Sequence, residues 1–162
     1  MNIGVRRFFA VALVACGFAA PALAQEGCIA LKSVAEIEKE TVDANGAKSK
    51  QLVPAGRVIP GTEVVWTVTA SNICQQPSDK VTISNAVPEH MTLVANSAVG
   101  PGSDITYSLD GKTFAKGGEL TVSADGGTRP ARADEYKPIR WEFKDSLAPG
   151  ASAFASFRAV LN

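Results

Sequence analysis

One segment near the middle of the chain constrains the fold more than any other. Residues 62–72, TEVVWTVTASN, alternate between two sets of side chains and are rich in β-branched residues, as is typical of a strand. The turn dipeptide Pro60-Gly61 stands directly before this segment. The face that we expect to be buried carries Val64, Trp66, Val68 and Ala70. A strand of this kind covers its apolar face with a second layer of structure.

Similar short segments recur along the rest of the chain, and turn signals separate them. These signals are Pro88, Asp110-Gly111, Gly117-Gly118, Asp125-Gly126-Gly127 with Pro130, and Pro149-Gly150. The expected strands cover residues 80–85, with Val81 and Ile83 inward, and residues 91–95, 104–109, 112–115, 119–123, 139–143 and 151–161. Because the strands are short and no helical pattern interrupts them, the sequence predicts an all-β, antiparallel β-sandwich.

The stretch at residues 29–53 admits two interpretations. The apolar residues with the spacing of a helix face are Leu31, Val34 and Ile37. Against a helix, the run DANG at 43–46 is a turn sequence, and the run QLV at 51–53 can return as a strand. We favour an N-terminal hairpin of two long strands joined at Asn45-Gly46, with a helix as the alternative.

The first 24 residues have the three parts of a secretory signal peptide. A short segment with Arg6 and Arg7 comes first, and an apolar run follows at residues 8–20. The run ALA at 22–24 then supplies the small residues that precede a cleavage site. The apolar run is short for a membrane span, and no second apolar run follows it.

Cleavage is expected between Ala24 and Gln25, which leaves residues 25–162 as a single mature domain. Two alternatives stay open, which are a retained membrane anchor and lipidation at Cys16. In the favoured interpretation the protein is exported, spans no membrane and works in the periplasm or at the cell surface.

Charge counts exclude one class of partner. The chain has 16 basic and 16 acidic residues, and loss of Arg6 and Arg7 with the signal leaves 14 against 16, a net charge of −2. A general nucleic-acid binder needs a basic face. We therefore expect no nucleic-acid partner.

Two cysteines stay in the mature chain, Cys28 and Cys74. An even pair in an exported protein predicts one structural disulfide. A pair of reactive thiols is the alternative, although no CxxC pattern is present.

Residues that carry chemistry are sparse. The only histidine, His90, stands in the turn sequence PEHM, and histidine catalysis needs a partner that holds the ring. Carboxylates that loops can bring together as a calcium site are Asp104, Asp110, Asp125, Asp134 and Glu135. Arginines that can form an anion-binding patch with Tyr136 are Arg129, Arg132 and Arg140. Neither set has the spacing of a known motif, so we expect no enzyme, no cofactor and no metal.

The large apolar side chains have two expected roles. Trp66, Trp141, Phe143 and Phe157 lie on apolar strand faces, so they are expected in the core rather than on a sugar-binding platform. The strand at 151–161 turns Phe154 and Val160 away from the core face. We favour a closing strand of its own sandwich, and an edge strand that adds to a neighbour's sheet is the alternative.

An ordered set of motifs runs through residues 29–161. The residues are Pro60, Gly61, Trp66 and Asn72 around the first strand, Pro88, Met91, Thr92, Val94 and Ser97 in PEHMTLVANS, Tyr107, Ser108, Asp110, Gly111 and Phe114 in YSLDGKTF, the IRW at 139–141, and Leu147, Pro149, Gly150 and Phe157 near the end. This set resembles the bacterial Ig-like "conserved repeat domain" family of exported and surface proteins. The resemblance implies an Ig-like β-sandwich outside the cytoplasm and no agreed catalytic residue. The single copy and the cysteine pair depart from the usual pattern of that family.

Three functions fit these observations. The first is a non-catalytic structural or interaction module of the bacterial envelope or cell surface, which binds a protein or an envelope component through loops or an edge strand. The second is a subunit that self-associates by strand exchange into a surface polymer. The third and least favoured is a carbohydrate-binding module or an enzyme, which would need convergent carboxylates or exposed aromatic side chains.

Overall fold

A computed structural model describes residues 27–124 and 126–162, and within them the chain is almost entirely β-structure. The strands are β1 (Ile29–Val42), β2 (Lys48–Pro54), β3 (Glu63–Asn72), β4 (Thr82–Ala86), β5 (Met91–Leu93), β6 (Ser103–Ser108), β7 (Phe114–Ala115), β8 (Thr121–Ala124), β9 (Gly127–Pro130), β10 (Pro138–Phe143) and β11 (Ser152–Leu161). A single 3-10 turn, η1 (Ala133–Glu135), precedes β10. The all-β prediction is confirmed. The expected signal peptide, its cleavage site at Ala24 and Gln25, and Cys16 lie outside the described residues.

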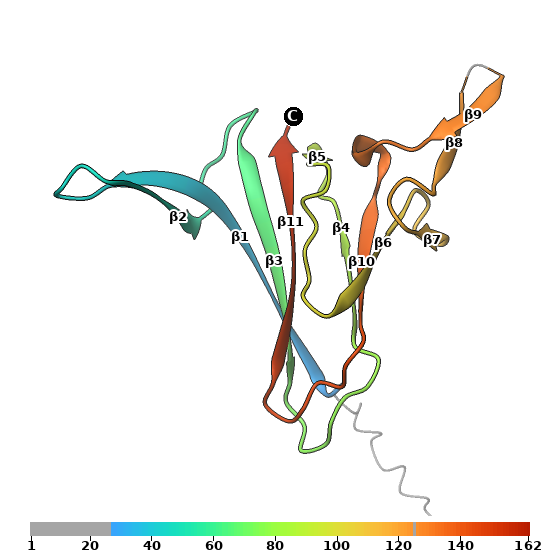
Figure 1. Ribbon diagram of the computed structural model, residues 1–162, viewed down its shortest axis with the longest axis horizontal. Helices are drawn as coiled ribbons and strands as arrows, with labels where there is room; N and C mark the ends of the chain where they lie inside the picture. Colours follow the sequence, from blue (N-terminus) through green and yellow to red (C-terminus); the bar gives the residue numbers. More distant parts are fainter. Residues whose placement is uncertain (1–26, 125) are drawn as a thin grey trace, which may run out of the picture.

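Every strand pair in the described chain is antiparallel. A five-stranded sheet has the order β2-β1-β3-β11-β5, and a four-stranded sheet has the order β4-β10-β6-β7. The short pair β8-β9 stands beside the second sheet (Figure 1). Consecutive strands therefore often lie in different sheets, and their neighbours come from distant parts of the sequence.

The core lies between the two larger sheets. Trp141 from β10 and Phe157 from β11 are fully buried, and their ring centroids lie 6.3 Å apart. Other buried members of this cluster are Val68, Ala70, Ile83, Leu93, Ile139, Ala155 and Ala159. Trp66 and Phe143 are half-buried and pack against the same cluster. All four aromatic residues that were expected in the core therefore contact it, since alternation along a strand directs every second side chain to one face.

The N-terminal stretch is a hairpin, as favoured, and not a helix. β1 pairs with β2 from Glu36 to Val42, and the residues that join the two strands form a tight turn. In this turn the Asp43 carboxylate accepts hydrogen bonds from the backbone N–H groups of Asn45 and Ala47, at 2.8 Å each. Gly46 adopts a φ of +82°, which a residue without a Cβ adopts readily.

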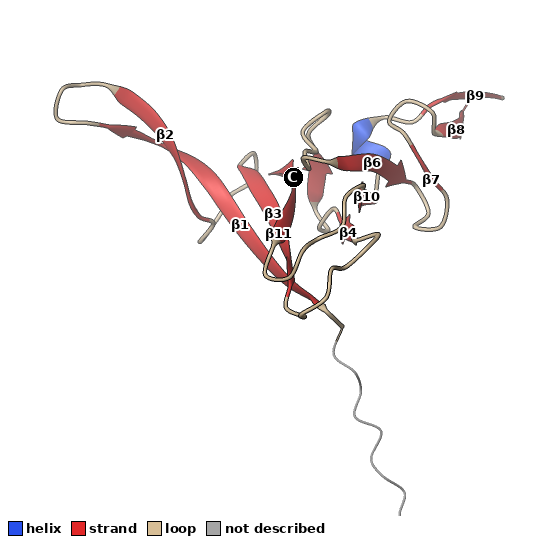
Figure 2. Cartoon of the chain, turned by 60° about the horizontal axis from the view of Figure 1, so that its bottom comes forward, coloured by secondary structure: helices blue, strands red, loops and turns tan. Residues whose placement is uncertain are grey.

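β1 is long enough to pair with two different strands. Its first half, Ile29–Glu36, pairs with β3, and its second half, Glu36–Val42, pairs with β2 on the opposite edge. The second half and β2 extend away from the two packed sheets as a two-stranded ribbon (Figures 1 and 2). We call this ribbon, residues 37–53, the arm.

One expectation about the strands is corrected by the structure. The segment around Pro130, expected as a loop, forms β9 and pairs with β8. Pro130 is tolerated because it lies at the end of a strand that has only one neighbour.

The alternative in which the last strand, β11, forms the edge of its sheet does not hold. This strand pairs with β3 from Ser152 to Val160 on one side and with β5 on the other. The backbones of Val99 and Ser156 also exchange two hydrogen bonds at 2.8 Å, which covers the middle of the second side. Phe154 is exposed and Val160 half-buried on the outer face, but the backbone of their strand is paired on both edges.

Candidate functional site

The predicted disulfide between Cys28 and Cys74 is present, with the two Cα atoms 5.1 Å apart. It joins the start of β1 to the residues just after β3. The two cysteines are 46 positions apart in sequence, and loop-closure entropy for such a separation corresponds to about 4 kcal/mol of stabilisation. The bridge therefore has a structural role at one end of the five-stranded sheet.

The buried side-chain amide of Asn72 organises the same end of the sheet. Its Nδ2 donates hydrogen bonds to the carbonyl oxygens of Gln76 and Leu147, both at 2.8 Å, and its Oδ1 accepts one from the N–H of Cys74 at 3.0 Å. These contacts hold two loops from different parts of the sequence against one strand end. Sequence reasoning marked Asn72 as a family position but did not reveal this role, because Leu147 is 75 positions away.

The acidic residues considered for calcium do not meet. Asp104 pairs with Lys144 at 2.9 Å, and Asp134 pairs with Arg132 at 3.0 Å. Asp110 closes its own turn by accepting hydrogen bonds from the backbone N–H groups of Lys112 and Thr113, and these bonds lower its pKa to about 2. Asp125 lies outside the described residues. Among the residues that the structure describes, no three His, Cys, Asp or Glu side chains gather as metal ligands.

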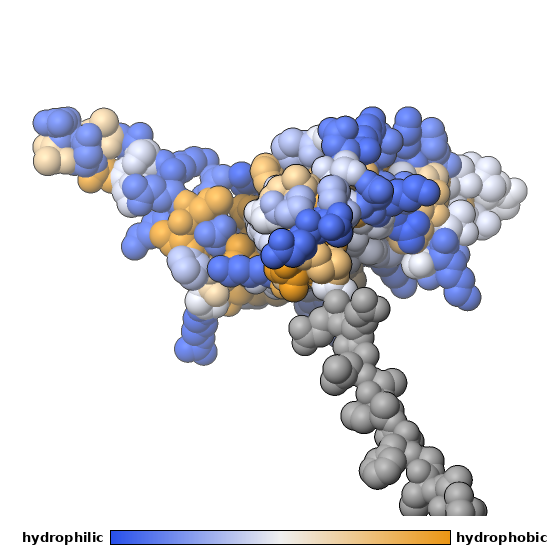
Figure 3. All heavy atoms as spheres, turned by 90° about the horizontal axis from the view of Figure 1, so that it is seen from below, coloured by the Kyte–Doolittle hydropathy of each residue, from blue (hydrophilic) through white to orange (hydrophobic). Residues whose placement is uncertain are grey.

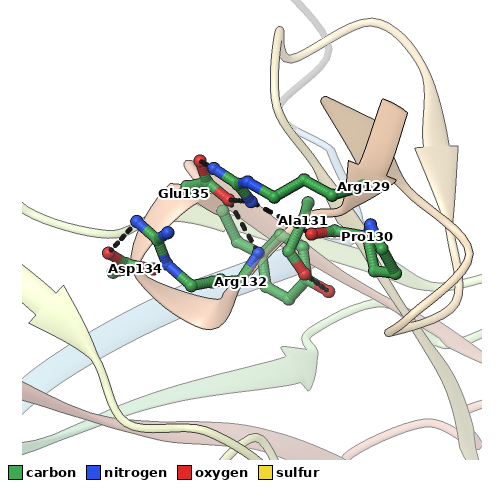
Figure 4. A network of polar contacts seen from close by, with 7 residues as sticks. Arg129, Pro130, Ala131, Arg132, Asp134 and Glu135 are labelled. Carbon is green, nitrogen blue, oxygen red and sulfur yellow. Dashed lines mark hydrogen bonds and ion pairs between the residues drawn. The ribbon is translucent and has the colours of Figure 1, made fainter. Parts of the chain in front are cut away.

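Glu135 belongs instead to a network of polar contacts between β9 and η1 (Figure 4). Both of its carboxylate oxygens accept hydrogen bonds from the Arg129 guanidinium, at 2.6 and 2.7 Å. The backbone N–H of Arg132 adds a third hydrogen bond at 2.8 Å. The bond from Arg129 is the main reason that the pKa of Glu135 is lowered to about 2. A carboxylate held in this way fixes the β8-β9 hairpin to the turn that follows it.

The three arginines considered for an anion-binding patch are each engaged elsewhere. Arg129 binds Glu135, Arg132 binds Asp134, and the guanidinium of Arg140 lies 3.5 Å from the centre of the Phe114 ring. Tyr136 is buried and stacks on Tyr107, with ring centroids 4.6 Å apart. The patch is therefore not formed, since internal partners neutralise or cover the cations.

The single histidine lies in an exposed turn. His90 has a φ of +62°, and its carbonyl oxygen accepts a hydrogen bond from the N–H of Asn162. The described structure shows no side-chain hydrogen bond to its ring. His90 is therefore a backbone element of the turn that leads into β5.

The arm is held in its orientation by an ion triad that the sequence did not reveal. Arg158 on β11 donates to Glu38 at 2.6 Å and to Glu63 at 2.7 Å, and so links the base of the arm to β3. The bond from Arg158 is the largest cause of the lowered pKa of Glu38. Two further pairs, Lys48–Glu40 at 2.7 Å and Lys50–Glu38 at 3.1 Å, join the strands of the arm.

The surface of the arm combines charges with exposed apolar side chains. Val42 and Leu52 are 59% and 48% exposed. No strand of the described chain lies beyond β2, so its outer backbone groups face solvent. Seen from below, apolar residues reach the surface on the side from which the arm extends, among hydrophilic neighbours (Figure 3). A projecting ribbon with open backbone edges and exposed apolar side chains has the features of a protein-interaction element.

Within the described residues, no helix has the length and apolar character needed to cross a membrane. Comparisons with protein-family models, with curated proteins and with solved structures found no match.

Proposed function

We propose that this protein is an exported, non-catalytic interaction module of the bacterial envelope or cell surface. Its Ig-like β-sandwich presents the arm to a partner protein or envelope component. The observation that carries the proposal is the arm itself, a ribbon that leaves the packed sheets and exposes Val42 and Leu52. The Cys28–Cys74 bridge is compatible with export, since disulfides persist in oxidising compartments.

The contacts at the base of the arm support an interaction role. A two-stranded ribbon is at best marginally stable by itself in water. Here Arg158 ties the ribbon to the body, and cross-strand ion pairs link its strands. An element held extended before binding loses less conformational entropy when a partner adds to it. The triad is therefore expected to support binding by keeping the arm in place.

Site-specific photo-crosslinking in cells of the source organism tests this proposal. A photoreactive residue is placed at Val42 on the arm, and a matched control is placed at Lys112, an exposed position in a turn outside the arm. We expect one discrete adduct from Val42 that is absent from Lys112. The same pattern from both positions, or no adduct from Val42 or from a second probe at Leu52, contradicts the proposal.

A second candidate function is a subunit that polymerises by strand exchange. The unpaired edge of β1, which lies beside an open groove lined by both apolar and polar residues, favours it. This candidate predicts a ladder of masses for the mature protein extracted from its envelope and analysed by size-exclusion chromatography with light scattering. A single discrete species argues against it.

A further inference from the structure

A half-enclosed hollow of about 200 Å³ lies on the side of the sandwich opposite the arm. β5 and β2 are the two edge strands of the five-stranded sheet, and β7 is an edge strand of the four-stranded sheet (Figure 1). The hollow is lined by Leu93 of β5, Tyr107 of β6, and Ala133 and Tyr136 at η1, together with the residues that follow β5 and β7. Segments of both sheets therefore converge on one site.

Small residues keep this hollow open. Ala95, Gly117, Gly118 and Ala133 line it, and none of these four has a side-chain atom beyond Cβ. A Cβ on Gly117 would lie 3.4 Å from Cε2 of Tyr107, so the backbone at this position packs closely on the ring. Gly118 has a φ of +87°, which a residue without a Cβ adopts readily. The space therefore follows from the residue types at its rim.

The two tyrosines of the hollow are held in fixed positions. Tyr107 stacks on Tyr136, with ring centroids 4.6 Å apart. The Tyr136 hydroxyl accepts a hydrogen bond from the N–H of Gly118 at 3.2 Å and donates one to the carbonyl oxygen of Ala131 at 3.4 Å. Glu135, the residue before Tyr136, is fixed in the polar network of Figure 4. A site that is already ordered loses less conformational entropy when a ligand binds.

Two polar side chains of the hollow are available to a ligand. Within the described residues, neither the Tyr107 hydroxyl nor the exposed side-chain amide of Asn96 makes a hydrogen bond. Burial raises the pKa of Tyr107, and the neighbouring Tyr136 adds to this rise, so the hydroxyl keeps its proton at neutral pH. A phenol and an amide each donate and accept hydrogen bonds. Both groups therefore match a ligand that carries hydroxyl groups.

The lining also restricts the charge and the size of a ligand. None of the described residues around the hollow carries a charge, and burial of an ion without a partner is costly, so the site favours an uncharged ligand. A cavity of about 150 Å³ holds one benzene molecule, so a hollow of about 200 Å³ admits one small ring. An extended peptide, in contrast, needs a longer groove with several pockets for its side chains.

We propose that this hollow binds one uncharged pyranose ring, either as a single sugar or at the end of a glycan chain. The C–H groups on the face of a pyranose pack against aromatic and apolar side chains, as Tyr107 and Leu93 provide here. The hydroxyl groups at its edge exchange hydrogen bonds with the Tyr107 hydroxyl and the Asn96 amide. The site lies away from the arm, so this inference goes beyond the proposed function and does not depend on it.

Saturation-transfer NMR on the mature, oxidised protein tests the proposal. The probes are the methyl glycosides of glucose, galactose, mannose and N-acetylglucosamine in both anomeric forms, each at millimolar concentration. We expect transfer to at least one of these glycosides, and the lack of transfer to every one of them overturns the proposal. A disaccharide of the bound sugar then distinguishes the two sources. Tighter binding of the disaccharide indicates the end of a glycan chain, and equal affinity indicates a single sugar.

Two variants test the polar groups separately. Tyr107→Phe removes the hydroxyl and keeps the ring, and it is expected to weaken binding about fivefold, as for one net hydrogen bond. Asn96→Gly removes the amide and is expected to have an effect of similar size. Glycine suits the φ of +58° at position 96, so this change does not strain the backbone. The matched control is Asn85→Ala on β4, outside the hollow, which should bind as the wild type does.

A third variant, Ala133→Leu, fills the hollow. It adds bulk to a half-buried position of the lining and is expected to abolish binding while the circular dichroism spectrum stays the same. Tyr107→Phe and Asn96→Gly decide the question if Ala133→Leu does not fold. Wild-type affinity in both of these variants overturns the proposal. Tighter binding of a proline-rich peptide than of any glycoside also overturns it, and indicates a peptide site instead.

Discussion

Replacement of Asn72 tests how much one buried amide contributes to this fold. The side chain is 1% exposed and makes three hydrogen bonds to backbone groups. Each is worth about 1 kcal/mol net, so Asn72→Ala is expected to lower the free energy of unfolding by about 3 kcal/mol. For a domain of this size, that loss corresponds to a fall in Tm of roughly 10 °C.

The variant Asn72→Asp distinguishes the effect on stability of losing hydrogen bonds from the effect of burying a charge. A carboxylate oxygen then replaces the donor that faces the carbonyl oxygens of Gln76 and Leu147, so burial and repulsion raise the pKa of the new carboxyl in the folded state. Each unit of that rise costs about 1.4 kcal/mol of stability at neutral pH. The extra penalty is absent below the unfolded pKa of about 4 and grows as the pH rises towards the folded-state pKa. Asn72→Asp is therefore expected to be less stable than Asn72→Ala at pH 7 and to recover in acid.

Urea denaturation followed by tryptophan fluorescence measures these differences, since Trp141 is fully buried. The matched control is Asn85→Ala on β4, a half-buried asparagine whose side chain makes no hydrogen bond within the described structure. Its expected effect is below about 0.5 kcal/mol. A loss below about 1 kcal/mol for Asn72→Ala, or a pH-independent Asn72→Asp, refutes the role assigned to this amide.

Two further predictions concern packing and charge. A Cβ on Gly100 would lie 2.5 Å from Cδ1 of Trp141 and 2.7 Å from Oγ of Ser103, so Gly100→Ala should cost about 1–3 kcal/mol of stability. Gly56→Ala, where nothing lies within 4 Å, should be close to neutral in the same urea titration. The lowered pKa of Glu135 means that its contribution to stability is complete above its ordinary pKa of 4.5 and is lost as the pH falls towards 2. Glu135→Gln should therefore flatten this part of the curve of Tm against pH, and an unchanged curve would show that the Arg129 pair does not stabilise the fold.

Sequence alternation predicted the strand faces well where one face packs on the core. Trp141 and Phe157 are buried as expected, because a period of two encodes which side chains point inward. Alternation carries no information on which strand lies next to which. For that reason an edge position for β11 stayed open as an alternative, although β3 and β5 enclose this strand. β9 was not expected because Gly127 and Pro130 are poor strand formers.

The polar contacts were harder to predict than the core. Arg158, Glu38 and Glu63 come from three strands, and only the folded sheet brings them together. The same is true of Asn72 and its partner Leu147. By contrast, the Cys28–Cys74 bridge was predictable, since these are the two cysteines that lie outside the expected signal peptide.

The position of β11 between β3 and β5 has a consequence for the order in which the chain folds. Thr67 on β3 and Ser156 on β11 are hydrogen-bonded although 89 positions separate them, and pairings of such long range form slowly. β1 can pair with β3 much earlier, and the bridge between Cys28 and Cys74 then locks that pair. Until β11 docks, the other edge of β3 stays open to strands of other chains. We therefore expect the risk of misassembly to be greatest between disulfide closure and the docking of β11.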